Sequence, residues 1–164
     1  MGPFKEEDLK SSLNMLQLNV NSLVQLTRLF LPPMLNRKTG HILNMASTAA
    51  FQPGPFTALY YASKAFVFSF SMALAEELKG TGVSVTTCCP GFTKTEFHAR
   101  AGMKRSRHFI PEMSAQAVAK AALEGMLAKK HVIIPGALNK ITSMVARHLP
   151  VTLTTKIVRR INGR

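Results

Sequence analysis

The 164-residue sequence has no tryptophan and only two cysteines, which are adjacent at positions 88 and 89. Neighbouring residues on a strand point to opposite faces, so we do not expect Cys88 and Cys89 to form a structural disulfide. So few cysteines fit a reducing compartment, and we expect a cytoplasmic protein. The five histidines are scattered without cysteine or carboxylate partners at metal-ligand spacing, and we therefore expect no metal site.

Acidic residues are also scarce. Eight Asp and Glu stand against 21 Lys and Arg, which gives a net charge of +13, and the last acidic residue is Glu124. Such an excess favours an anionic partner such as nucleotide phosphates, anionic lipid or nucleic acid, although a solvated basic surface explains it equally well. The apolar stretch before Pro32 is interrupted by Asn, Gln and Arg, so we do not interpret it as a membrane span.

The hydrophobic periodicity predicts alternating helices and short strands. Helices are expected over 7–31, 60–78 and 114–130, with Ser114 as N-cap, and Pro32 and Pro33 should end the first of them. Strands are expected over 41–46, within "GVSVTTCCPG" (82–91, where Pro90 ends the run) and over 131–136, and residues 92–113 should be irregular. This alternation is typical of an α/β domain with a parallel sheet, here incomplete, and we expect a further segment in front of residue 1.

Residues 47 to 64 carry the most reactive combination of side chains. "YYASK" places Lys64 four residues after Tyr60 and three after Tyr61, so on a helix either phenol could lie near the ammonium. A nearby positive charge lowers a phenol pKa from its usual value near 10 toward neutrality. Ser47 follows a strand, where ligands bind in open α/β sheets. Ordinary helix surface explains the same spacing, and the residues alone do not choose between the tyrosines.

Five separated elements resemble the short-chain dehydrogenase/reductase family over residues 3–136. They are Asn19 in "LNVNS", Ser47 in "ILNMAST", Tyr60 and Lys64 in "YYASK", and Pro90-Gly91 in "CCPGFTKTEF". The resemblance implies a Rossmann-like parallel sheet with flanking helices, of which this sequence supplies about three of the usual seven strands. It divides the chain into a dehydrogenase part, 1–137, and a basic amphipathic helical tail, 138–164.

The resemblance also assigns roles to these residues. Tyr60 becomes the proton donor, with Tyr61 as its packed or substrate-side neighbour, and Ser47 orients the substrate carbonyl. Lys64 lowers the pKa of Tyr60 and binds the nicotinamide ribose. Asn19 holds a water within a bend of the long helix, with Asn21 as a competitor for this role. The remaining cofactor contacts, together with Tyr60 and Lys64, fall on Pro90, Gly91, Thr93 and Thr95.

The implied function is NAD(P)-dependent oxidation of a secondary alcohol or reduction of a carbonyl, with NADP slightly preferred over NAD. The resemblance implies a small-molecule carbonyl or alcohol as partner, a second copy bound through helices 7–31 and 60–78, and no nucleic acid. Burial within one subunit explains the apolar helix 60–78 equally well. The sequence contains no glycine-rich dinucleotide turn, so we expect the 164 residues alone to be inactive. The alternative is an inactive fragment acting as an interaction module, its basic tail peripheral to an anionic membrane surface.

Overall fold

The computed structural model describes residues 2–96 and 111–163. Its helices, in chain order, are a 3-10 turn η1 (Phe4–Glu6), α1 (Leu9–Leu16), a π-helical turn η2 (Gln17–Asn21), α2 (Ser22–Asn36), a 3-10 turn η3 (Thr48–Phe51), α3 (Ala58–Glu77), α5 (Ala115–Leu127), α6 (Ala137–His148) and α7 (Val151–Asn162). Its strands are β1 (Gly40–Met45), β2 (Val83–Cys88), β3 (Thr93–Lys94), β4 (Met113–Ser114) and β5 (Val132–Ile133).

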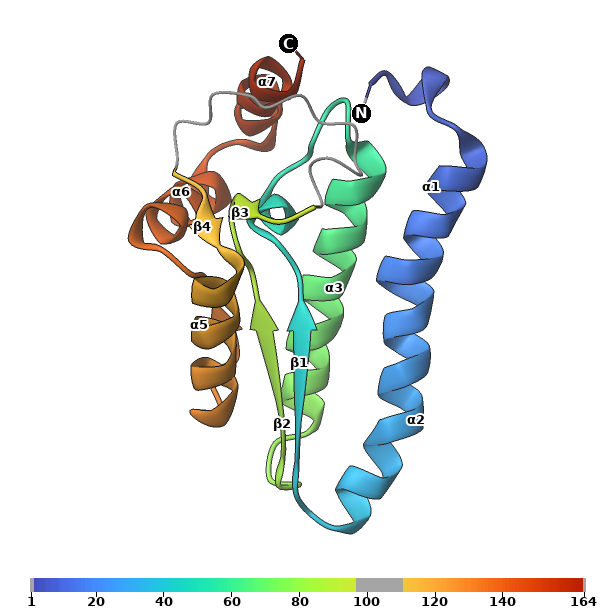
Figure 1. Ribbon diagram of the computed structural model, residues 1–164, viewed down its shortest axis with the longest axis vertical. Coiled ribbons are helices and arrows are strands. Elements are labelled where there is room, and N and C mark those ends of the chain that lie inside the picture. The colour runs from blue at the N-terminus through green and yellow to red at the C-terminus, as the bar shows by residue number, and fades with distance from the viewer. Residues whose placement is uncertain (1, 97–110, 164) are drawn as a thin grey trace.

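A parallel sheet of order β1-β2-β5 forms the centre of the fold. The continuous helix α1–η2–α2 and the helix α3 lie beside this sheet, and α5 lies on its other side (Figure 1). This arrangement confirms the predicted α/β fold and all three predicted strands. The short parallel pair β3–β4 falls within the stretch predicted to be irregular, because two-residue strands leave no hydrophobic periodicity to detect.

The first long helix differs from the prediction at its end. Pro32 and Pro33 do not stop it, and α2 continues to Asn36. A proline leaves the carbonyl four residues earlier without its helical partner. Those carbonyls belong to Arg28 and Leu29, which are exposed, so water can replace the missing amides. Beyond the prolines the helical pattern resumes, since the Arg37 amide donates to the Pro33 carbonyl at 3.3 Å.

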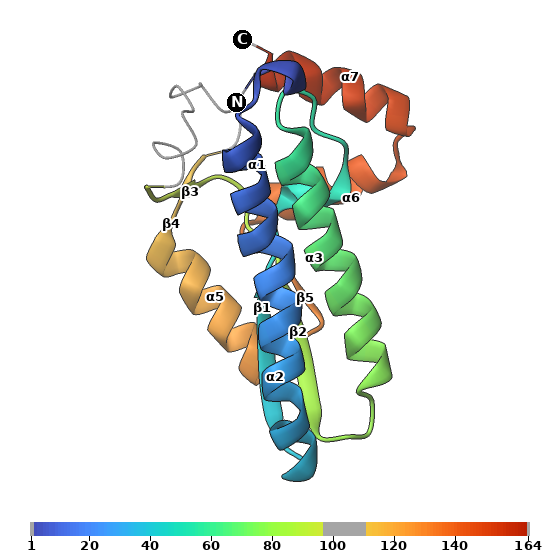
Figure 2. The same cartoon turned by 90° about the vertical axis from the view of Figure 1, so that its right-hand side faces the viewer.

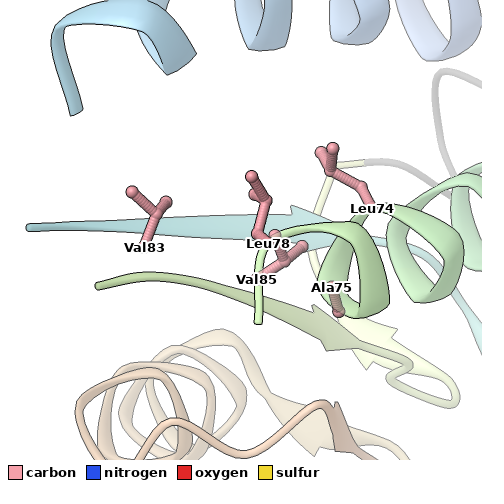
Figure 3. Close-up of a cluster of buried hydrophobic side chains, with 5 residues drawn as sticks. All are labelled: Leu74, Ala75, Leu78, Val83 and Val85. Carbon is pink, nitrogen blue, oxygen red and sulfur yellow. The ribbon is translucent and has the colours of Figure 1, made fainter. Parts of the chain in front are cut away.

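The best-defined apolar cluster joins the C-terminal half of α3 to β2. Leu74, Ala75 and Leu78 pack on Val83 and Val85, all buried (Figure 3). The helix α3 has the length and apolar composition of a membrane span, a property shared by core helices of soluble proteins. Its contacts are with β2, β1 and η3. They fix the register of its first turn, which carries both tyrosines.

Candidate active site

The carboxyl ends of β1 and β2 bring two distant segments together. Met45 and Cys88 are register partners, and just beyond them the Ala46 amide donates to the Cys88 carbonyl at 2.8 Å. The pairing extends into the loops, where the Thr48 amide donates to the Pro90 carbonyl at 3.0 Å. The Ser47 hydroxyl points the same way, with Oγ 3.4 Å from the Pro90 carbonyl. The structure therefore places Ser47 beside Pro90 at the strand ends.

Ser47 is fixed by a local capping interaction. Its backbone is extended, and its Oγ accepts a hydrogen bond of 3.1 Å from the Ala49 amide as the N-cap of η3. Serine is favoured at this position because its short side chain folds back on the following amides. The side chain is buried, so capping and burial together leave the hydroxyl little rotational freedom. That rigidity suits a group that orients a substrate atom.

The two tyrosines occupy different surroundings on the first turn of α3. Burial raises the pKa of Tyr60, and a hydrogen bond with the Ser47 side chain opposes that rise. Burial also raises the pKa of Tyr61, which instead forms a hydrogen bond with Asn162 of α7. The Tyr61 ring packs so closely on Gly54 that a Cβ there would lie 2.2 Å from it. Tyr60 is thus the phenol that faces Ser47, whereas Tyr61 joins the loop to the C-terminal helix.

Lys64 lies one turn beyond Tyr60 but is directed elsewhere. Its Nζ donates to the Met45 carbonyl at 3.0 Å and lies 5.8 Å from the centroid of the Tyr60 ring. Burial lowers the pKa of the Lys64 ammonium, and its proximity to Cys89 acts in the opposite direction. In this arrangement the ammonium binds the end of β1, and burial is the largest influence on the pKa of the phenol. That Lys64 lowers the pKa of Tyr60 remains a prediction.

Asn19 reaches the same site through a serine on α3. It lies in the π-helical turn η2, where the amide Nδ2 donates to Ser63 Oγ at 3.1 Å. The buried Ser63 hydroxyl donates in turn to the Tyr60 carbonyl at 2.8 Å. Asn21, the competitor, is exposed and donates to Gln17 on its own helix. A π-helical turn widens the helix by one residue and commonly marks a functional site.

The segment after β2 is held against α6. Pro90 and Gly91 lie beside Ser47, and the Thr93 hydroxyl donates to the Gly91 carbonyl at 3.0 Å. A Cβ on Gly91 would lie 2.3 Å from Oδ1 of Asn139, so a larger residue there would displace the Asn139 side chain. Asn139 is itself buried and donates to the Pro135 carbonyl at 2.8 Å. Thr95 lies just past β3 and is exposed.

Sequence reasoning missed three residues of the tail that contact this site. They are Asn139, Arg147 and Asn162. The Arg147 guanidinium lies 4.1 Å from the ring centroid of Phe51 and 5.0 Å from that of Phe68, which secures α6 on η3 and α3. Asn162 donates to the Pro55 carbonyl and to Thr57 Oγ1, both at 3.0 Å, just before Tyr60. Such contacts join residues far apart in the sequence and leave no local pattern in it.

The two adjacent cysteines lie at the carboxyl end of β2. Cys88 and Cys89 are free thiols in separate apolar clusters, which confirms the prediction that they form no disulfide. Burial raises the pKa of Cys88 to about 11 and that of Cys89 to about 12, so neither is a reactive thiolate at neutral pH. Among residues 2–96 and 111–163, no three His, Cys, Asp or Glu side chains are grouped to hold a metal ion.

The sequence is similar to a known protein family and to individual members of it. A family described as short chain dehydrogenase matches residues 1–106. Mouse 17-beta-hydroxysteroid dehydrogenase type 3 is 36% identical over 137 residues, and zebrafish very-long-chain 3-oxoacyl-CoA reductase-B is 32% identical over 145 residues. The alignments cover 82% and 88% of this chain but only 44% and 45% of those proteins. The chain thus spans about half the length of the curated relatives it matches.

Solved structures share the fold. A short-chain dehydrogenase from Sphingobium yanoikuyae in complex with NADPH has a TM-score of 0.76 at 27% identity, covering 91% of this chain and 61% of that one. One from Burkholderia phymatum in complex with NAD has a TM-score of 0.78 at 22% identity, covering 93% and 63%. At that lower identity the likeness shows the fold alone. The sheet and its helices are therefore Rossmann-like.

Proposed function

Because the chain belongs to the short-chain dehydrogenase/reductase family, we propose that it supplies the proton-transfer site of an NAD(P)-dependent oxidoreductase. The observation that carries the proposal is the pairing of Tyr60 with Ser47 at the carboxyl ends of β1 and β2. Lys64 on the next turn and Asn19 through Ser63 complete the group. Ligands of open α/β sheets bind at such strand ends.

The reaction proposed is interconversion of a carbonyl and a secondary alcohol. The bound nicotinamide supplies or accepts the hydride. Ser47 donates a hydrogen bond to the carbonyl oxygen and aligns it with Tyr60, whose hydroxyl gives that oxygen its proton. The raised pKa keeps Tyr60 protonated at neutral pH, so this site favours carbonyl reduction there. Alcohol oxidation requires the phenolate, and its rate should therefore rise with pH.

The residues present fit the nicotinamide end of a dinucleotide. An ammonium has three donors, and the Met45 carbonyl takes one from Lys64, which leaves this group suited to bind a ribose hydroxyl. Pro90, Gly91 and Thr93 form the strand-end segment against which the carboxamide would lie. Solved relatives in complex with NADPH and with NAD support either dinucleotide. The names of the mouse and zebrafish relatives favour a lipophilic ketone as substrate.

A second copy of the chain is part of the proposal. The predicted homodimer would use α1–α2 and α3. Apolar residues exposed on these helices support it: Leu9, Leu13, Leu26, Leu29, Phe30 and Phe66. Burial of such side chains between two copies would provide the apolar core that stable interfaces contain.

Cofactor titration tests the proposal. The complemented protein is defined as residues 1–164 preceded by the glycine-rich nucleotide-binding half of a short-chain dehydrogenase. We expect it to bind NADPH or NADH with a micromolar dissociation constant, measured by reduced-nicotinamide fluorescence. The 164 residues alone should show no saturable binding in that range, because phosphate affinity resides in the glycine-rich turn that the sequence lacks. Failure of the folded complemented protein to bind either cofactor would contradict the proposed function.

A further inference from the structure

Helix α6 turns its polar side toward the protein, and helix α7 leaves much of its apolar side exposed. The side chains that α6 and α7 bury are Asn139, Ser143, Thr154 and Val158, three of them polar. Eight large apolar residues on the same helices are exposed: Leu138, Ile141, Met144, Val145, Val151, Leu153, Ile157 and Ile161. An amphipathic helix on a globular core normally buries its apolar stripe. On α6 that stripe faces outward, and on α7 it is only partly covered.

Helical spacing gathers the exposed residues into continuous stripes. On α6, Leu138, Ile141 and Val145 recur at three and four residues, so they share one face. Asn139 and Ser143 lie on the opposite face of that helix. On α7, Leu153, Ile157 and Ile161 recur every four residues beside the buried Thr154 and Val158. The α6–α7 surface is defined as the eight exposed apolar residues on these two helices.

The helices that carry the α6–α7 surface are fixed to the rest of the protein by side-chain contacts. Arg147 stacks on Phe51 and Phe68, and Asn162 donates to Pro55 and Thr57. Figures 1 and 2 show both helices at the end of the molecule where β1 and β2 terminate. The exposure of apolar residues on α6 and α7 is therefore held by specific inward contacts. It is not a consequence of a detached tail.

The positive charge around this surface indicates what kind of partner binds it. Exposed cations border the apolar stripes, namely Lys140, Lys156, Arg159 and Arg160, and no acidic residue follows Glu124. A second copy would bring the same positive charge against them, which opposes self-association. A strand that pairs with the free edge of β1 would extend the sheet on the side opposite β5, and β5 is the strand that leads into α6. Such a strand would therefore not cover the α6–α7 surface. An anionic bilayer offers both apolar depth and complementary charge.

We propose that the α6–α7 surface binds anionic lipid bilayers, with its apolar side chains in the interface and its cations on the headgroups. The test is co-sedimentation of the monodisperse 164-residue chain with phosphatidylcholine vesicles, with and without phosphatidylserine. We expect binding to anionic vesicles to exceed binding to neutral ones by about tenfold and to weaken at high salt. Equal binding to both vesicles, or binding to neither, would overturn the proposal.

Matched variants locate the contact. Ile141→Ser with Met144→Ser should reduce anionic-vesicle binding by about tenfold, since it removes two exposed apolar groups. The control, Leu123→Ser with Leu127→Ser, removes two exposed apolar groups from α5 and should leave binding unchanged. Thermal unfolding checks that each variant is folded. If the α6 variant instead abolishes concentration-dependent dimerisation while vesicle binding persists, the surface binds a second copy and the bilayer proposal is wrong.

Discussion

Tyr60→Phe in the complemented protein should lower the rate of carbonyl reduction on the order of a thousandfold. The substitution removes the hydroxyl that pairs with Ser47 and would protonate the substrate oxygen. Tyr61→Phe should retain activity within about threefold of the parent, because that hydroxyl binds Asn162 on the opposite side of the loop. Steady-state turnover of NADPH with a ketone substrate measures both variants.

The matched pair of tyrosines makes this result decisive. Both variants delete one buried hydroxyl on the same helical turn, so the overall loss of stability should be similar. Cofactor binding of each variant is measured alongside, to show that the site is assembled. If Tyr61→Phe is inactive while Tyr60→Phe turns over, the active-site register is off by one residue. If both remain active, the proton donor is another group.

Gly82→Ala should produce a large loss of stability. Gly82 precedes β2 with φ of +85°, and a Cβ there would lie 1.9 Å from the Lys38 carbonyl oxygen. Left-handed backbone alone costs alanine about 1–2 kcal/mol. Overlap with a backbone carbonyl adds a steric cost that no side-chain rotation relieves. We therefore expect the free energy of unfolding to fall by roughly 3 kcal/mol or more in total. The thermal unfolding midpoint Tm should fall by about 10 °C.

Gly80→Ala provides the control for backbone strain. Gly80 has a similar φ of +78°, but a Cβ there meets no atom within 4 Å. We expect only the conformational cost, about 1 kcal/mol or a few degrees in Tm. The difference between the two variants measures how tightly the turn after α2 packs on the turn before β2. Equal losses of stability for Gly80→Ala and Gly82→Ala would show that the contact between these two turns contributes nothing to stability.

Features set by local patterns could be predicted from the sequence. Helical spacing placed the tyrosines and Lys64 on one helix, a short apolar run identified β1, and a run of β-branched residues identified β2. The N-cap at Ser114 was equally predictable, and its Oγ accepts from the Ala117 amide at 3.1 Å. Each of these depends on neighbours within a few residues.

Features set by distant contacts could not be predicted. The direction of Lys64 depends on the Met45 carbonyl, which lies at the end of another element. The continuation of α2 through Pro32 and Pro33 depends on the exposure of the carbonyls that they leave unpaired. The outward apolar face of α6 depends on Asn139 and Arg147 finding partners on Gly91, Phe51 and Phe68. Amphipathic spacing specifies that a helix has two faces and leaves open which of them is buried.

Deuterium transfer tests the central claim most directly. The complemented protein is given a lipophilic ketone and NADPH or NADH carrying deuterium at C4 of the nicotinamide, on one face or the other. The account predicts an alcohol with one deuterium on the former carbonyl carbon, from one face only, and loss of this product in Tyr60→Phe. A protein that binds the cofactor yet transfers deuterium from neither face would contradict the assignment of Ser47, Tyr60 and Lys64 to carbonyl reduction.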